Sequence, residues 1–233
     1  MPKILLIETS TEVCSVGISD NGHVVSLREK RDQKSHASSL ALFIEQALSD
    51  AAMQPQMLDA VAVSSGPGSY TGLRIGVSTA KGMCYGLNIP MIAVDTLQSL
   101  AMGFAAENQK VISQNDLIIP MIDARRMEVY AASFDNTGDR INATEAIILN
   151  EQSFSNHSSG RIWLLGDGAA KTAELFANRA EMQIMRDFLP SARYMANLAF
   201  SAFKKEEFAD HAYFEPFYLK DFVAGIPKVK GLK

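Results

Sequence analysis

The fold is decided by residues 60–76, which read Ala60-Val61-Ala62-Val63-Ser64-Ser65-Gly66-Pro67-Gly68-Ser69-Tyr70-Thr71-Gly72-Leu73-Arg74-Ile75-Gly76. The apolar residues 61–63 predict a short buried strand, and residues 72–87 carry the spacing of an amphipathic helix. Between them lies a glycine-rich elbow that ends in hydroxyl residues suited to capping that helix. Such an elbow either offers free backbone N–H groups to a phosphate or carboxylate, or lets two segments pack closely. The sequence leaves both uses open.

The elbow matches neither of two common nucleotide-binding loops. A P-loop ends in Gly-Lys-Ser/Thr, whereas a leucine follows Gly72. A dinucleotide-binding fingerprint needs a third glycine where this chain has Thr71, although Gly66 and Gly68 fit. Gly66, Gly68 and Ser69 are therefore candidates for a degenerate anion site.

Composition favours an ordinary globular protein in a reducing compartment. The 233 residues are 47% hydrophobic and 21% charged, and they suffice for one large domain or two small ones. A net charge of -4 disfavours a broad basic face for nucleic acid, although lysines recur in the last six residues. Two cysteines make no disulfide framework, and the start lacks a signal peptide. No run approaches the roughly 20 apolar residues that span a bilayer, so we expect a cytoplasmic protein with no membrane contact.

The order of predicted elements indicates an α/β fold with a mixed sheet. Three antiparallel strands are expected first, then a helix, a strand, a helix, a strand and a helix capped by Asp95. The expected ranges are 4–7, 14–18, 23–28, 38–52, 60–63, 72–87, 90–94 and 95–104. This order differs from the strict βαβ alternation of a dinucleotide-binding domain.

The second half of the chain predicts a smaller lobe. Strands are expected at 117–122, 127–134, 143–149 and 162–165, with a helix after Gly166-Asp167-Gly168 and another from Ser191. Residues 151–160 are rich in serine and asparagine and predict an exposed loop. We expect one lobe at 1–104 plus 191–233, and the other at 105–190. No internal repeat is obvious by eye.

Residues Glu8-Thr9-Ser10-Thr11 follow the first predicted strand and form a second candidate site. A carboxylate followed by hydroxyls can hold Mg²⁺ through water and bind a phosphate tail. Alternatively, the hydroxyls satisfy backbone groups of the turn. The residues favour neither alternative.

Other chemistry-bearing residues have plainer explanations. Arg125 and Arg126 could clamp a phosphate, but surface pairing with Glu128 is the commoner arrangement. His36 is expected to be exposed or to cap a helix, because no His-Glu-x-x-His or similar metal motif exists. Cys84 lies on an apolar helix face and is expected to be buried and structural.

Several segments together resemble the bacterial TsaB family, formerly YeaZ. The most specific are Gly66-Pro67-Gly68-Ser69-Tyr70-Thr71-Gly72-Leu73-Arg74 and Asp123-Ala124-Arg125-Arg126. Weaker matches lie at residues 4–11, 35–37, 94–97, 166–169 and 218–220. They occur in order over nearly the whole chain.

The resemblance implies an actin-like ATPase (ribonuclease H-like) fold of two lobes with mixed sheets and a reduced second lobe. It places a degenerate nucleotide or anion site at Glu8, Thr9, Ser10, Gly66, Gly68, Ser69, Gly166 and Gly168. The family usually has Asp in place of Glu8, which puts Mg²⁺ binding in doubt. The catalytic paralogue, TsaD, carries an Asn-His-x-x-Gly-His metal segment, and the comparable residues 95–100 hold no histidine. The resemblance therefore implies no metal, no cofactor and no catalytic residue.

The implied function is a non-catalytic scaffold in the formation of N6-threonylcarbamoyladenosine (t6A) at position 37 of ANN-decoding tRNAs. The implied partners are TsaD in a heterodimer, the ATPase TsaE within the complex, a second copy when TsaD is absent, and tRNA through the complex. Two helices would supply the contacts, with the residues Leu40, Ile44, Leu73, Gly76, Val77, Ala80 and Cys84. The rivals are an ATPase or small-molecule kinase of the same fold, and a metallopeptidase.

Overall fold

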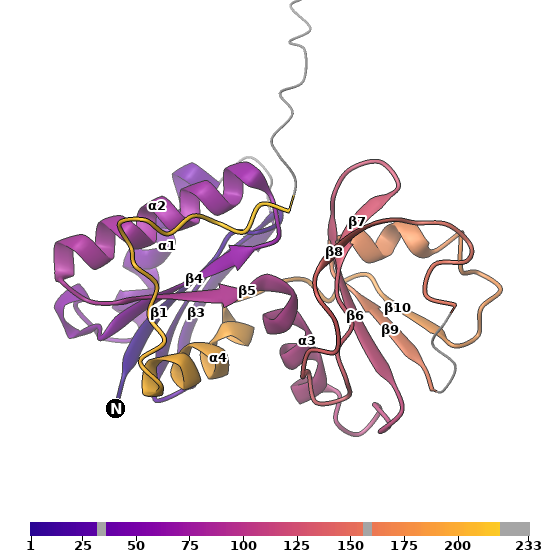
Figure 1. The fold of residues 1–233 in the computed structure, drawn as a ribbon. Coiled ribbons are helices and arrows are strands. Elements are labelled where there is room, and N and C mark those ends of the chain that lie inside the picture. Colours follow the sequence, from indigo (N-terminus) through magenta and orange to yellow (C-terminus); the bar gives the residue numbers. More distant parts are fainter. Residues whose placement is uncertain (32–35, 156–159, 220–233) are drawn as a thin grey trace, which may run out of the picture.

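The computed structural model describes residues 1–31, 36–155 and 160–219. Within them, helices and strands alternate over two sheets (Figure 1). The first half contains β1 (Lys3–Glu8), β2 (Val13–Asp20), β3 (His23–Arg31), α1 (His36–Asp50), η1 (Pro55–Met57), β4 (Ala60–Gly66), α2 (Tyr70–Leu87), β5 (Met91–Asp95) and α3 (Thr96–Glu107). The second half contains β6 (Leu117–Asp123), β7 (Glu128–Ala131), β8 (Glu145–Ile148), β9 (Ile162–Leu165), η2 (Asp167–Thr172), β10 (Met182–Met185) and α4 (Ala192–Lys204).

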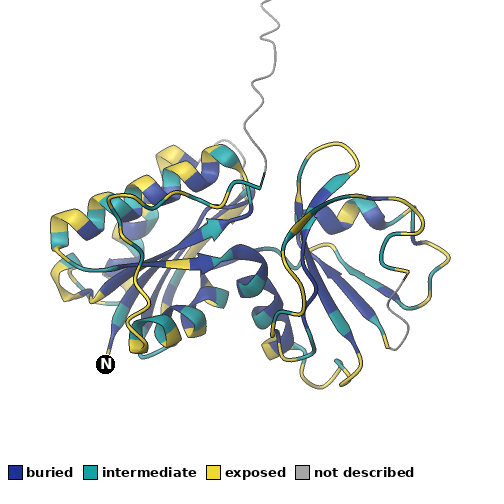
Figure 2. Cartoon of the chain, viewed as in Figure 1, coloured by how far each residue is buried: buried dark blue, intermediate teal, exposed yellow. Residues whose placement is uncertain are grey.

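The first sheet has the strand order β3-β2-β1-β4-β5 and is covered on both faces. Because β1 lies at its centre, its apolar run is buried on both sides, with Leu5 and Ile7 toward α1 and α2. Ile4 and Leu6 point the other way and pack against α4. The strands are accordingly dark in Figure 2, whereas the outer sides of α1 and α2 are exposed.

The second sheet has the order β10-β9-β6-β7-β8 and repeats the plan of the first. In each sheet the first three strands are antiparallel neighbours, and the last two add in parallel to the other side of the first strand. α3 covers one face, where Phe104 packs among residues of β6 and β9. η2 and Phe176 cover the other face. The two sheets therefore share a topology that the sequence did not reveal.

Two helices and one ion pair join the lobes. α3 packs against α4, and a Cβ on Gly103 would lie 2.3 Å from the ring of Tyr194. Arg140, from the segment between β7 and β8, pairs with Asp95 at the end of β5 at 2.7 Å. α3 belongs to the first lobe in the predicted division at residue 104, yet its side chains pack in the core of the second sheet. The boundary therefore stays a prediction. No helix in the described residues is long and apolar enough to cross a membrane.

The helix starts were predicted best. Asp95 Oδ1 accepts from the Gln98 N–H at 2.8 Å and caps α3 as expected. α4 begins next to Ser191, as expected, and the Ser191 side chain caps it. The predicted helix after Gly166 is wrong: η2 is a 3₁₀ helix of six residues, in which the Ala169 N–H donates to the Gly166 carbonyl. The predicted strand 127–134 ends at residue 131, and β10 was not predicted because four residues carry too little periodicity.

Candidate functional site

The glycine-rich elbow packs directly against the turn that follows β1. The Ser69 N–H donates to the Ser10 carbonyl at 2.6 Å, and Thr9 Oγ1 donates to the Gly72 carbonyl at 2.8 Å. A Cβ on Gly68 would lie 2.4 Å from the Ser10 carbonyl oxygen, and one on Gly72 would lie 2.1 Å from that of Thr9. Of the two uses that the sequence left open, close packing accounts for these glycines.

Two backbone donors of the elbow, the N–H groups of Ser69 and Gly72, are engaged within the chain. Ser69 Oγ accepts from the Gly72 N–H at 3.3 Å and caps α2. Gly66 has a φ of +104°, and a Cβ there would lie 2.9 Å from the Phe217 carbonyl oxygen. The Phe217 N–H donates to the Ser65 carbonyl at 2.7 Å, so the C-terminal segment covers a further side of the elbow.

Glu8 is completely buried at the bottom of this arrangement. Its Oε1 accepts from the Ser10 N–H at 2.6 Å, whereas Oε2 and Ser10 Oγ have no hydrogen-bond partner. Burial raises the pKa of Glu8 despite the hydrogen bond from the Ser10 N–H, and so favours the neutral acid. A neutral carboxyl is a poor Mg²⁺ ligand. Over the described ranges, no three His, Cys, Asp or Glu side chains are placed to hold a metal ion.

The Gly166-Asp167-Gly168 loop lies on the second sheet. Gly166 has a φ of +89°, and a Cβ there would lie 2.3 Å from the Met121 carbonyl oxygen. Asp167 Oδ1 accepts from the Asp123 N–H at 3.0 Å. Burial, together with the charges of Asp123 and Glu12, raises the pKa of Asp167 to about 6. Because Glu12 belongs to the turn after β1, this loop faces the first lobe.

The turn between β6 and β7 presents Arg125 and Arg126 to solvent. Both have positive φ, +71° and +49°. Neither side chain makes a hydrogen bond or ion pair with a described residue, so the expected pairing with Glu128 is not found. Lys171 instead occupies the base of the hairpin, at 2.6 Å from Asp123 Oδ1 and 2.8 Å from the Glu128 carbonyl oxygen.

The helix residues expected to contact a partner are buried in the chain's own core. All seven face the first sheet: Leu40, Ile44, Leu73, Gly76, Val77, Ala80 and Cys84. Gly76 is packed so closely that a Cβ would lie 2.3 Å from Thr9 Oγ1. This corrects the assignment of contact residues, because helical spacing identifies an apolar face but not what covers it.

The outer side of α1 and α2 carries several small residues, beside larger exposed ones such as Arg74 and Glu45. α2 exposes Thr71, Ser78, Gly82 and Gly86, and a Cβ on either glycine would meet nothing within 4 Å. Beside them, α1 exposes Ala41 and Leu42, and α2 exposes Tyr85. A groove of about 360 Å³ lies next to this face, lined by Ala41, Ile44, Glu45, Leu48, Ser49, Met53, Gln54, Pro55 and Met83.

Two single residues were predicted with different success. Cys84 is buried, as expected, and burial raises the pKa of its thiol to about 11. His36 is not exposed: its Nε2 lies 2.8 Å from the Thr11 carbonyl oxygen and ties the start of α1 to the turn after β1. Its partner is 25 residues away, which local sequence signals do not report.

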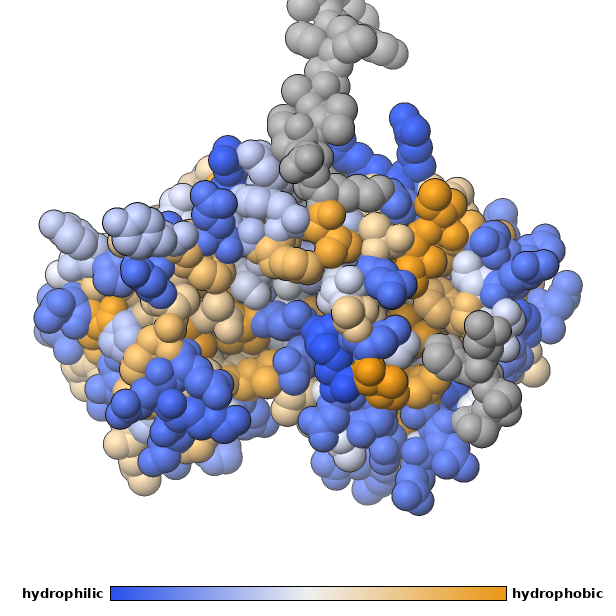
Figure 3. Space-filling view, in the orientation of Figure 1, coloured by the Kyte–Doolittle hydropathy of each residue, from blue (hydrophilic) through white to orange (hydrophobic). Residues whose placement is uncertain are grey.

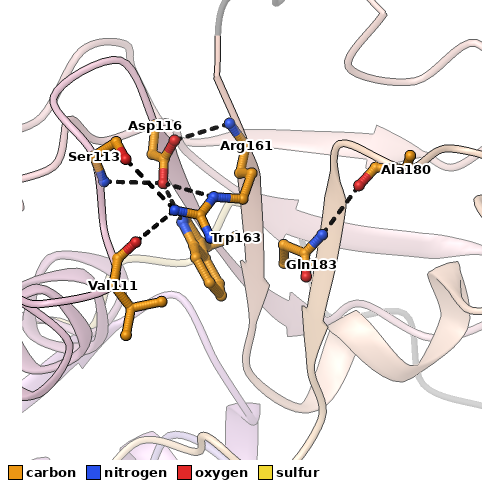
Figure 4. Close-up of polar contacts among 7 residues, drawn as sticks. All are labelled: Val111, Ser113, Asp116, Arg161, Trp163, Ala180 and Gln183. Carbon is orange, nitrogen blue, oxygen red and sulfur yellow. Dashed lines mark hydrogen bonds and ion pairs between the residues drawn. The ribbon is translucent and has the colours of Figure 1, made fainter.

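A buried aspartate at the opposite end of the second lobe was not singled out from the sequence (Figure 4). Asp116 accepts hydrogen bonds from the Arg161 N–H at 2.9 Å, Trp163 Nε1 at 2.9 Å and the Ser113 N–H at 3.1 Å. Burial disfavours its charge, but these bonds and the Arg161 guanidinium outweigh burial and lower the pKa of Asp116. These contacts join the start of β6 to β9 and hold this end of the second sheet together.

Comparisons with known proteins identify relatives in the biosynthesis of threonylcarbamoyladenosine on tRNA. Residues 30–228 match the family model described as "TsaD: tRNA N6-adenosine threonylcarbamoyltransferase". The chain is 30% identical to the tRNA threonylcarbamoyladenosine biosynthesis protein TsaB of Escherichia coli K12, over 95% of this chain and 96% of that protein. The TsaB protein of Haemophilus influenzae is 26% identical over 94% of each chain.

A solved structure supports the fold. YeaZ from Pseudomonas aeruginosa superposes with a TM-score of 0.79 at 24% identity, covering 94% of this chain and 100% of that one. With the two mixed sheets described above, this likeness confirms the expected actin-like α/β fold of two lobes.

Proposed function

Because this chain belongs to the TsaB (YeaZ) family and so has a role in t6A biosynthesis on tRNA, we propose that it is the non-catalytic scaffold of that pathway. It binds TsaD and holds it in the form that transfers threonylcarbamoyl to adenosine 37. TsaE joins the assembled complex, tRNA reaches it through the complex, and the protein works in the cytoplasm. In the absence of TsaD, two copies pair through the same helices.

The observation that carries this proposal is the closure of the first-lobe turn by the elbow. A phosphate between them would need the N–H groups of Ser69 and Ser10, which donate to Ser10 and Glu8. It would also need space that the elbow fills, since even a methyl group on Gly68 or Gly72 would collide with the turn. A protein of this fold without an open phosphate site is suited to binding a partner rather than to phosphoryl transfer.

The outer side of α1 and α2 supports docking through helices. Small exposed residues let a second helix approach closely, as Gly82 and Ser78 would here. Leu42, with 49% exposed, and Tyr85, with 83% exposed, add apolar area at the edges of the strip. The corrected contact face is therefore Ala41, Leu42, Ser78, Gly82 and Tyr85.

Docking is tested with a substitution on this outer face. Gly82→Arg adds a long side chain where nothing in the chain is displaced, so the protein should stay folded and fail to bind TsaD. Ser201→Arg is the matched control, because Ser201 is exposed on α4, which covers the opposite face of the first sheet. Light scattering after gel filtration with TsaD should give a heterodimer for wild type and Ser201→Arg only. A heterodimer with Gly82→Arg would place the contact elsewhere.

The ATPase or kinase rival is tested separately by calorimetry of the isolated chain with Mg²⁺ and ATP. The scaffold proposal predicts no heat of binding at micromolar protein and no turnover. Micromolar binding with hydrolysis would favour the rival. Metal analysis of the purified protein likewise addresses the metallopeptidase rival, which requires stoichiometric metal.

A further inference from the structure

The β6–β7 hairpin holds two arginines in a backbone conformation that arginine seldom adopts. Left-handed φ angles at consecutive turn positions are characteristic of Asn-Gly or Asp-Gly in hairpins. Here Arg125 and Arg126 occupy them, with φ of +71° and +49°. Unfavourable backbone conformations persist where the surroundings fix them, and they concentrate at functional positions.

The surroundings do fix this turn. The Ala124 N–H donates to the Glu128 carbonyl at 3.1 Å, and the Glu128 N–H donates to the Arg125 carbonyl at 3.1 Å. The Arg125 N–H donates to Asp123 Oδ1 at 2.5 Å, and the Leu149 N–H donates to the Met127 carbonyl at 2.7 Å. The tip is therefore a rigid platform.

The two guanidinium groups make no hydrogen bond or ion pair with the residues that the structure describes. Asp123, at the end of β6, is paired with Lys171 at 2.6 Å. Lys171 is itself only 15% exposed and also donates to the Glu128 carbonyl, so it is not available to a ligand. Two adjacent guanidiniums on a fixed backbone are suited to the oxygens of phosphates.

The shape of the site favours a long polyanion over a small one. The hairpin projects beyond the end of the second sheet (Figure 1), and at this corner of the surface a hydrophilic projection stands above a hydrophobic patch (Figure 3). A free nucleotide would need enclosing walls, which a projecting tip does not supply. A nucleic-acid backbone needs only positive points spaced along it.

We propose that Arg125 and Arg126 form a contact for the phosphodiester backbone of RNA. The identity of that RNA as tRNA rests on the proposed function, whereas the contact itself does not. Because the net charge of the chain is -4, the contact is local and supplies roughly two phosphate contacts, so the chain alone should bind RNA weakly at low salt.

The test measures anisotropy of a fluorescein-labelled, unmodified tRNA transcript titrated with the full chain at several salt concentrations. Arg125→Gln with Arg126→Gln should weaken binding about tenfold at low salt and reduce the slope of log K against log salt by roughly 1.8. Lys110→Gln with Lys204→Gln removes the same charge from exposed positions away from the hairpin and should change affinity less than twofold. Equal losses in both double variants, or no binding of tRNA by folded wild type, would overturn the proposal.

A second variant separates binding from folding. Arg125→Asn with Arg126→Gly supplies the residues that this turn prefers, so it should raise the melting temperature while weakening tRNA binding as much as the glutamine variant. Displacement of tRNA by polyglutamate as effectively as by unlabelled RNA would identify an acidic-protein site instead and overturn the RNA contact. Heterodimer formation with TsaD should be unchanged in all hairpin variants, so a failed docking experiment and a failed RNA contact give different results.

Discussion

The two lobes use one strand plan but differ in the turn after the first strand. In the first lobe this turn begins at Glu8 and is sealed by the elbow, with Thr9 and Ser10 completely buried. In the second lobe the equivalent turn begins at Asp123 and projects into solvent with Arg125 at its tip. Turns at equivalent positions of one topology are therefore buried against the elbow in one lobe and exposed, with two arginines, in the other.

The coverings of the two sheets differ in the same way. The first sheet is covered on one face by α1 and α2, of 15 and 18 residues, whereas η2 in the second lobe has six. The outer faces of these long helices are where we propose that a partner binds the first lobe. The second sheet has α3 on one face, but on the other face only η2 and Phe176 cover it.

The largest effect is expected where the elbow meets the turn. Gly72→Ala places a methyl group 2.1 Å from the Thr9 carbonyl oxygen, so it should lower the free energy of unfolding by about 3 kcal/mol. Gly82→Ala is the matched helix control, and it should raise that free energy by about 1 kcal/mol because its Cβ meets nothing. Urea denaturation measures both. Equal stability of Gly72→Ala and wild type would mean that the turn is open in solution.

The second lobe should depend most on Asp116. Asp116→Ala leaves buried donors, including Trp163 Nε1, unpaired, which should cost about 2 to 3 kcal/mol. Because its folded pKa is lowered, its contribution is full above the unfolded pKa and is lost as pH falls through the folded value. Urea midpoints should therefore converge between wild type and Asp116→Asn in acid. Asp187→Ala, at an exposed position, should change stability little.

Asp167 should behave in the opposite way. Its folded pKa of about 6 exceeds the ordinary value, so its ionisation destabilises the fold, and stability is lost as pH rises from about 4 to about 6. Asp167→Asn keeps an oxygen for the Asp123 N–H and should be more stable than wild type by roughly 1.5 kcal/mol at pH 7.5. The difference should vanish near pH 4. Melting temperatures across this range check it, and a constant difference would contradict the assignment.

The smallest effect is expected at the ion pair between the lobes. Arg140 and Asp95 are about one-third exposed, so their coupling energy should be about 0.5 kcal/mol. A double-mutant cycle with Arg140→Gln and Asp95→Asn measures it, and asparagine can still cap α3. Coupling above about 2 kcal/mol would show that the pair holds the lobes together more firmly than its exposure implies.

Local chemistry explains what the sequence could predict. The strand before the elbow, the helix caps at Ser69 and Asp95, and the start of a helix near Ser191 depend on neighbouring residues, and the sequence predicted them. The bonds of His36 to Thr11 and of Asp116 to Trp163 join residues 25 and 47 positions apart, and no local pattern reports them. The shared topology of the sheets was equally invisible, because a strand plan is kept by alternation of apolar residues rather than by their identity.

The residues alone predicted two separate candidate sites, the elbow and the turn at Glu8, and only the resemblance joined them. Ser10 does lie against Gly68 and Ser69, and an anion site there stays a prediction. Whether such a site is open depends on how closely two segments about 60 residues apart in the sequence pack together. Composition and spacing do not determine that packing.

The most direct test of the scaffold is threonylcarbamoyl transfer to unmodified tRNA by TsaD, TsaE and the synthase, measured with and without this chain. We expect transfer with wild type and with Ser201→Arg, and little or none without the chain or with Gly82→Arg. Full transfer in the absence of the chain would contradict it.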